Sequence, residues 1–89
     1  MKILYVTSEA APLVKTGGLA DVSYALPRAL RALGHDCRIV IPAYGAIPES
    51  SLGEQAAPCT AYLEGPVHGA VRRSTLPGSD VPLYLIEHN

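Results

Sequence analysis

The first 42 residues combine two apolar runs with an apolar stripe between them, and this order constrains the fold more than any other feature. Lys2 to Thr7 is a short run with aliphatic residues at its centre, as in a buried strand, and Asp36 to Ile41 is a second run that Pro42 ends. Between them, apolar residues recur at the three- and four-residue intervals of an amphipathic helix. These residues are Leu19, Val22, Leu26, Leu30 and Leu33. The pattern predicts a strand–helix–strand unit with parallel strands, which is the opening of a doubly wound α/β sheet.

The ends of the predicted helix carry residues that helix ends prefer. Asp21 lies in the first turn, where a negative charge suits the helix dipole, and Gly34 follows the last turn as the residue that ends the helix. Pro27 lies inside the apolar pattern and removes one backbone hydrogen bond. We therefore expect one kinked helix, with two short helices as the alternative.

The second half of the chain predicts a β-hairpin and one further strand. After a loop over residues 43–53, the segments Ala57–Glu64 and Val67–Leu76 have the composition of two hairpin strands, with Gly65-Pro66 as their turn. A turn cluster follows at residues 77–80, and Val81–Glu87 is an apolar last strand. The expected architecture is therefore the parallel unit followed by a β-hairpin and one more strand.

Size and composition point to part of a larger α/β domain. A chain of 89 residues buries only roughly 60–65% of its unfolded surface. Hydrophobic residues make up 48% of the chain and charged residues 17%, and neither Trp nor Phe occurs, so the apolar content is aliphatic. Such content suits parallel strands that are covered on both faces. We expect that further chain covers some of this surface.

Charge and cysteine content exclude several classes of function. A net charge of −1 is unlike the basic footprint of a nucleic-acid-binding protein. The apolar runs are far shorter than the ~20 residues of a membrane span, and the first run stops before a signal peptide would be complete, so we expect a cytoplasmic protein without membrane contact. Cys37 and Cys59 lack the spacing of metal ligands, and we expect both to be reduced and structural.

The loop between the first strand and the helix has the chemistry of an anion-binding site. Ligands of open α/β sheets bind beyond the carboxyl ends of the strands, where this loop is expected. Gly17 and Gly18 leave the backbone free of side chains, and the helix that follows presents N–H groups and a partial positive charge. Lys15 adds a mobile full charge. The loop therefore predicts a diphosphate or sugar-nucleotide ligand.

Two familiar phosphate-binding motifs do not fit this loop. A dinucleotide-binding loop has the pattern G-x-G-x-x-G and an acidic residue at the end of the second strand, whereas here the glycines are adjacent and the strand ends in Ile41-Pro42. A P-loop has the pattern G-x-x-x-x-G-K-[ST], whereas here Lys15-Thr16 precedes the glycines. The predicted site is therefore of another type.

The chain resembles the N-terminal part of bacterial glycogen synthases and plant starch synthases. The match extends over nearly the whole chain and is densest over residues 1–45, where the K-T-G-G-L loop after S-E-A-A-P is highly specific. Ala20 departs from the family pattern, in which a glycine is common. The matching segments are Met1–Pro12, Lys15–Val22, Ala25–Pro27 with Leu30, Gly34–Asp36, Ile41–Pro42 with Tyr44–Gly45, and Pro82–Ile86.

This resemblance implies the N-terminal part of a Rossmann-like doubly wound α/β sheet, which is the first half-domain of a two-domain glycosyltransferase of the GT-B type. Residues 1–89 would then be a partial N-terminal catalytic domain, with the C-terminal domain absent. The implied reaction moves glucose from ADP-glucose to the non-reducing end of an α-1,4-glucan (glycogen or starch), with retention at the anomeric carbon. The resemblance implies no metal and no organic cofactor.

The resemblance also assigns roles to residues of the loop. Lys15, Gly17 and Gly18 are expected to bind ADP-glucose, and Thr16, Glu9 and Asp21 are further candidates for substrate contact. Glu9 is a candidate for contact with the acceptor glucan, whereas for Asp21 a role as a helix N-terminal charge is as plausible. Tyr44 follows a strand end, where it either packs or lines the cleft. No catalytic residue is expected within these 89 residues.

Three functional hypotheses remain open from the sequence. The first is part of a glycogen or starch synthase that is inactive alone, because stabilising the leaving diphosphate needs donors on both sides of it. The second is a non-catalytic α/β module that binds a nucleotide or a glucan. The third is another two-domain glycosyltransferase with a different sugar donor. The residues themselves do not separate ADP-glucose from UDP-glucose; only the resemblance favours ADP.

Overall fold

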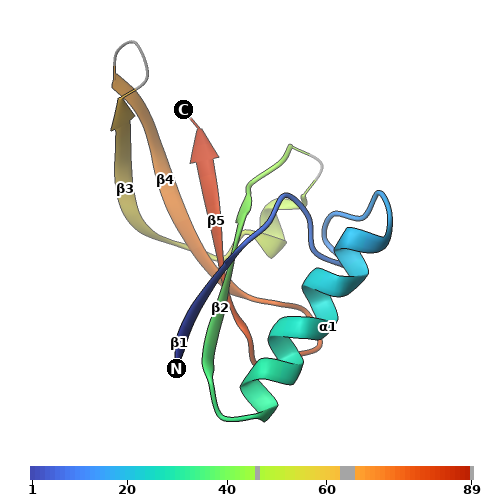
Figure 1. The fold of residues 1–89 in the computed structure, drawn as a ribbon. Helices are drawn as coiled ribbons and strands as arrows, with labels where there is room; N and C mark the ends of the chain where they lie inside the picture. The colour runs from blue at the N-terminus through green and yellow to red at the C-terminus, as the bar shows by residue number, and fades with distance from the viewer. Residues whose placement is uncertain (46, 63–65, 89) are drawn as a thin grey trace.

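The described part of the chain forms one five-stranded mixed sheet with one α-helix against it (Figure 1). The computed structural model describes residues 1–45, 47–62 and 66–88. The strand order is β1-β2-β5-β4-β3. The elements are β1 (Lys2–Val6), α1 (Gly18–Ala32), β2 (Asp36–Pro42), the short 3₁₀ helix η1 (Glu49–Ser51), β3 (Glu54–Tyr62), β4 (Pro66–Thr75) and β5 (Pro82–His88).

The predicted strand–helix–strand unit is confirmed. β1 and β2 lie parallel, with Ile3 beside Cys37 and Tyr5 beside Ile39. β5 then extends the parallel part on the other side of β2. All three strands therefore end at one edge of the sheet, which is called the carboxyl edge below.

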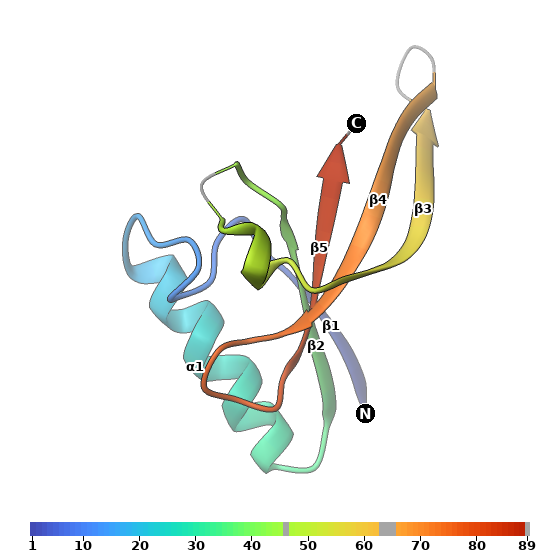
Figure 2. The same cartoon turned by 180° about the vertical axis from the view of Figure 1, so that it is seen from behind.

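The predicted hairpin is confirmed with shifted bounds. β3 and β4 pair antiparallel, and β4 also pairs antiparallel with β5. β3 begins at Glu54, three residues earlier than predicted, and residues 63–65 of the predicted strand and turn lie outside the described part of the chain. The hairpin extends away from α1 in both views (Figures 1 and 2), so it takes no part in the loop that joins β1 to α1.

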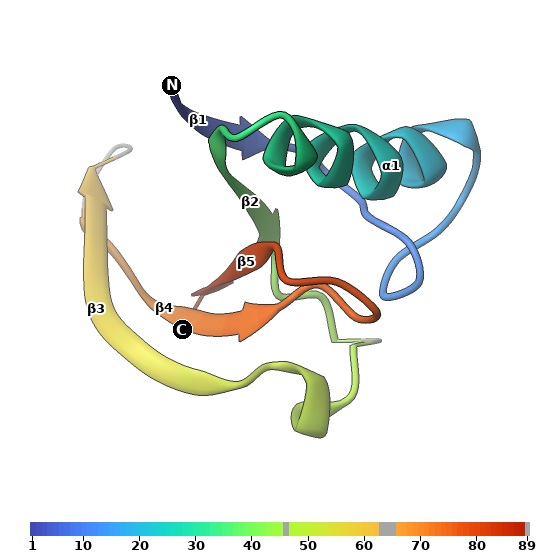
Figure 3. The ribbon, with the colours of Figure 1, turned by 90° about the horizontal axis from the view of Figure 1, so that it is seen from below.

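The core lies on one side of the sheet. Ile39 and Ile41 of β2 and Leu83 and Leu85 of β5 alternate toward it, as expected for strands with one buried face. α1 and η1 lie on this same side (Figure 3). The buried cluster consists of Ala10, Ile39, Ile41, Ile47, Leu52, Leu76, Val81, Leu83 and Leu85. Its inclusion of Ala10 means that the loop after β1 is packed into the core.

α1 is a single helix that includes Pro27, as preferred from the sequence, but its buried face differs from the apolar stripe. Ala20, Ser23 and Pro27 are buried. Four of the five stripe residues are instead between 42% and 76% exposed: Leu19, Val22, Leu26 and Leu33. The helix therefore approaches the sheet through compact side chains, and most of its large apolar side chains face outward.

The opposite face of the parallel strands is also apolar and exposed. Leu4 and Val6 of β1 are 62% and 72% exposed, and Ile86 of β5 is exposed as well. β1 forms one edge of the described sheet. That further chain covers these surfaces stays a prediction. In the described part of the chain, no helix is long and apolar enough to cross a membrane.

Candidate functional site

The loop between β1 and α1 is folded back against the helix at the carboxyl edge. Val14 N–H donates to the Ala10 carbonyl over 3.0 Å, and Ala11 N–H donates to the Ala20 carbonyl over 3.1 Å. The Thr7 hydroxyl lies 3.1 Å from the buried Ser23 hydroxyl of α1. These contacts fix the loop at its start and in its middle, so its last residues emerge at a defined place beside the first turn of α1.

Glu9 is the polar centre of this loop. Its side chain is buried, and its Oε2 accepts hydrogen bonds from the backbone N–H of Thr16, over 3.2 Å, and from the Thr16 hydroxyl. Its Oε1 accepts a hydrogen bond of 3.1 Å from the backbone N–H of Ala20, in the first turn of α1. The N-cap residue is Gly17, which has no side chain to bond the exposed N–H groups of a helix start. Glu9 supplies that missing acceptor from nine residues before α1.

The glycine pair faces open space. Gly17 has φ −177° and ψ −156°, an extended conformation that any residue can adopt. A Cβ atom at Gly17 or Gly18 would meet no atom of the described chain within 4 Å. Neither backbone conformation nor packing therefore requires glycine at these two positions. Their missing side chains leave room beside the start of α1 for something outside the chain.

Lys15, two residues before the glycine pair, forms an ion pair with Asp21 in the first turn of α1. Its Nζ lies 2.9 Å from Asp21 Oδ1, and both side chains are more than half exposed. Exposed ion pairs stabilise a protein by only about 0–1 kcal/mol. The Lys15 ammonium can therefore exchange Asp21 for another anion at little cost.

A pocket of about 540 Å³ lies against this loop. The Tyr44 hydroxyl donates to the Ser8 carbonyl over 2.9 Å at its rim, so Tyr44 lines the cleft, one of its two predicted placements. A second, mostly apolar pocket adjoins it at the ends of β1, β2 and β5. The first pocket is lined by Ser8, Glu9, Leu13, Val14, Lys15, Thr16 and Tyr44.

The structure thus brings together the residues that were predicted as a site. Glu9, Thr16 and Lys15 line one pocket, Asp21 pairs with Lys15, and the glycine pair adjoins them. Their contacts with a substrate stay predictions. The capping role of Glu9 was not predicted from the sequence. The available sign was a helix start with glycine at the N-cap and no side chain there to bond the first N–H groups.

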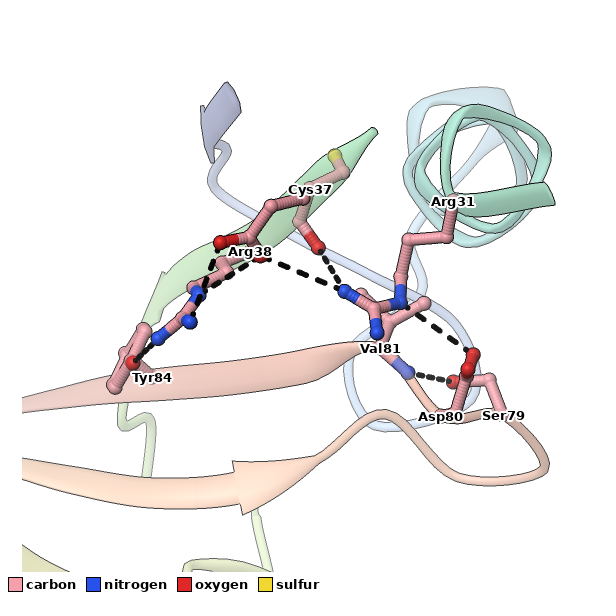
Figure 4. A network of polar contacts seen from close by, with 8 residues as sticks. Arg31, Cys37, Arg38, Ser79, Asp80, Val81 and Tyr84 are labelled. Carbon is pink, nitrogen blue, oxygen red and sulfur yellow. Dashed lines mark hydrogen bonds and ion pairs between the residues drawn. The ribbon is translucent and has the colours of Figure 1, made fainter. Parts of the chain in front are cut away.

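A second polar cluster lies at the other end of α1, at the amino ends of the strands (Figure 4). Arg31 of α1 lies 3.7 Å from Asp36 and 3.6 Å from Asp80, and its Nη1 donates to the Cys37 carbonyl over 3.5 Å. Arg38 donates to Asp36 over 3.1 Å and to the Tyr84 hydroxyl over 2.7 Å. The cluster ties α1 to β2 and to the turn before β5.

The charged groups of this second cluster pair with one another across α1, β2 and the turn before β5. A cavity of about 740 Å³, larger than the one at the glycine loop, lies here. However, the Arg31 and Arg38 guanidinium groups are held by Asp36 and Asp80. The hydrogen bond from Arg38 lowers the pKa of the Asp36 carboxyl. Cavity size alone is therefore a poor guide to the site, and the glycine loop is the better candidate.

Cys37 enters the cluster at Arg31 through its backbone carbonyl. Cys37 is free and buried, and burial raises the pKa of its thiol, as expected for a reduced structural cysteine. The prediction for Cys59 concerns a side chain outside the described part of the structure.

Comparison with known proteins agrees with the predicted resemblance. The family model described as the starch synthase catalytic domain matches residues 2–89. Glycogen synthase 2 of Geobacter sulfurreducens is 46% identical over 91 residues, and that of Geobacter metallireducens is 49% identical over 90 residues; each match covers 99% of this chain and 18% of the relative.

A solved structure gives the same result. The catalytic domain of starch synthase IV from Arabidopsis thaliana, bound to ADP and acarbose, superposes with a TM-score of 0.83 at 27% identity, over 98% of this chain and 18% of that one. The chain therefore spans about a fifth of the length of the relatives it matches. It belongs to the family of starch synthase catalytic domains.

Proposed function

We propose that this chain is part of a retaining glucosyltransferase that moves glucose from ADP-glucose to the non-reducing end of an α-1,4-glucan, and that its Lys15–Gly18 loop binds the sugar nucleotide. The observation that carries the proposal is the glycine pair, which the chain itself does not require and which faces open space beside a helix start and a lysine. A diphosphate has the charge and the size to use such a place.

In the proposed complex, the diphosphate lies against the bare backbone of the glycine pair. The first N–H groups of α1 have no partner within the helix. Glu9 already binds that of Ala20, so those of Gly18 and Leu19 remain to face phosphate oxygens. When the site is empty, Asp21 holds the Lys15 ammonium beside it. When the diphosphate binds, the ammonium moves from Asp21 to the diphosphate. Thr16 lines the same pocket as Lys15, where it is placed to contact the substrate.

The relatives support the choice of ligands. Arabidopsis starch synthase IV was solved with ADP and acarbose bound, and the Geobacter relatives are glycogen synthases. The 89 residues would form the first part of an N-terminal Rossmann-like domain, and the rest of the donor site would lie in the remaining part of the full-length enzyme. Since the leaving diphosphate needs donors on both of its sides, we expect no glucosyl transfer by these residues alone. A cytoplasmic location stays a prediction.

A chimeric enzyme tests this proposal. In glycogen synthase 2 of Geobacter metallireducens, the matching stretch is replaced by residues 1–89 of this chain, and glucosyl transfer from ADP-glucose and UDP-glucose to glycogen is measured. Lys15→Met should raise the KM for ADP-glucose about tenfold or more, as expected for the loss of a charged hydrogen bond. Lys2→Met is the matched control, because Lys2 is exposed at the amino end of β1.

Three outcomes would count against the proposal. Equal KM values for ADP-glucose in the Lys15→Met and Lys2→Met enzymes would show that the loop does not bind the sugar nucleotide. Faster transfer from UDP-glucose than from ADP-glucose would show that the proposed donor is wrong. A chimeric enzyme that binds ADP but transfers no glucose would favour the alternative of a non-catalytic nucleotide-binding module.

A further inference from the structure

The Glu9 carboxylate spans the glycine pair. Its two oxygens bind Thr16, immediately before the pair, and Ala20, two residues after it. Glycine has more backbone freedom than any other residue, so a loop with two adjacent glycines has many conformations to lose when it binds a ligand. A side chain that fixes both ends of such a segment reduces this freedom before the ligand arrives.

The contacts of Glu9 match the two acceptor oxygens of a carboxylate. All three partner groups are donors, namely the N–H and O–H of Thr16 and the N–H of Ala20. A carboxylate accepts at both oxygens, whereas a glutamine of the same shape has an NH₂ group in place of one of them. In the glutamine variant, that NH₂ group would face the donors of Thr16 or of Ala20. Because the side chain is only 7% exposed, water cannot readily replace the lost acceptor.

The same contacts set Glu9 apart from a substrate ligand. Both oxygens are used by the chain, and a carboxylate beside a diphosphate would repel it unless protein donors absorbed its charge. We propose that Glu9 is a positioning residue: its carboxylate holds the Lys15–Gly18 loop in the conformation that binds the sugar nucleotide, and does not itself contact the nucleotide. This inference rests on the proposed function.

The test uses the chimeric enzyme described above with Glu9→Gln. The KM for ADP-glucose should rise about tenfold, the effect of losing one hydrogen bond to a buried charge, while the KM for glycogen stays within about twofold. Glu87→Gln is the matched control. It changes a carboxylate that binds Arg72 between β5 and β4, away from the loop, and should leave both KM values unchanged.

Hydrogen exchange separates positioning from general instability. In the Glu9→Gln enzyme, peptides that cover residues 8–22 should exchange their amide protons faster, whereas peptides that cover residues 81–87 should keep their protection. A second substitution, Thr16→Val, removes the hydroxyl donor that faces Glu9. If Glu9 acts through Thr16, the double variant Glu9→Gln/Thr16→Val should raise the KM for ADP-glucose by less than the product of the two single effects.

Two results would overturn the inference. If Glu9→Gln leaves the KM for ADP-glucose unchanged while Lys15→Met raises it, Glu9 has no positioning role, although the proposed function stands. If protection is lost in both peptides and both KM values change together, Glu9 is a general structural residue. A null result for Lys15→Met as well would instead reject the proposed function.

Discussion

The two ends of α1 use similar chemistry for different purposes. At each end, a carboxylate binds groups of the helix and joins it to neighbouring chain: Glu9 at the first turn, and Asp36 with Arg31 at the last. At the last turn, the charged groups meet opposite charges of the same chain. At the first turn, the carboxylate is bound in the same way, but bare backbone remains beside it, and the exposed Lys15–Asp21 ion pair next to it costs little to separate. A ligand is expected at the end where the chain leaves open space beside bare backbone and a lysine whose ion pair is easily exchanged.

The glycines at these ends show the same contrast. Gly34 has φ +95°, a conformation that L-residues rarely adopt, and its N–H and that of His35 bond back to the Arg31 and Leu30 carbonyls of the last turn. Gly34 is therefore required by the backbone, as predicted for the residue that ends the helix. Gly17 has an extended conformation and open space around it, so the backbone does not require glycine there.

Gly17→Val should produce the largest effect, and it acts on binding. Valine fits an extended backbone, and its side chain would occupy the space proposed for the diphosphate. We expect kcat/KM for ADP-glucose in the chimeric enzyme to fall about 100-fold, as for a substrate displaced by about 1 Å, with no loss of thermal stability. Unchanged kcat/KM would remove the distinction between the two ends of α1.

Gly34→Ala should have the opposite pattern. Its Cβ would meet no described atom within 4 Å, so the effect comes from the left-handed backbone alone. We expect the free energy of unfolding, measured by urea denaturation of the chain, to fall by about 1–2 kcal/mol. The kcat/KM for ADP-glucose in the chimeric enzyme should stay the same. A fall comparable to that of Gly17→Val would contradict the distinction between the two glycines.

Asp36→Asn should give the smallest effect, visible only as a pH dependence. Because the hydrogen bond from Arg38 lowers the folded-state pKa of Asp36 below 3.8, Asp36 stabilises the fold above that pH and loses this contribution as the pH falls through the folded-state pKa. The urea midpoint of the unsubstituted chain should therefore fall more between pH 5 and pH 3 than that of Asp36→Asn. Parallel pH profiles would show that this cluster contributes nothing through Asp36.

The sequence predicted the parallel half of the fold well, because its signals are local. Short aliphatic runs marked β1 and β2, and Gly34 marked the end of α1. The start of β3 was missed because Glu54 and Gln55 are polar and follow Gly53, which looks like the end of a loop. That strand is instead set by its pairing with β4.

Side-chain orientation was harder to predict than the elements themselves. The apolar stripe predicted the helix but not which of its side chains face the sheet, because periodicity shows that a face is apolar and not what covers it. The Lys15–Gly18 site was predicted because a lysine followed by two adjacent glycines, between a strand and a helix, is an uncommon sequence. The role of Glu9 was not, because a hydrogen bond across seven residues leaves no periodic trace in the sequence.

The outward-facing leucines of α1, together with Leu4 and Val6 of β1, have a practical consequence for handling these residues in isolation. An apolar surface of this kind, next to the edge strand of a sheet, favours self-association and precipitation at high concentration. Solubility would then be limited by the outer side of α1 and β1 and not by the stability of the core. A charged residue at Leu33, which is 76% exposed, is a natural first change for keeping the isolated chain in solution.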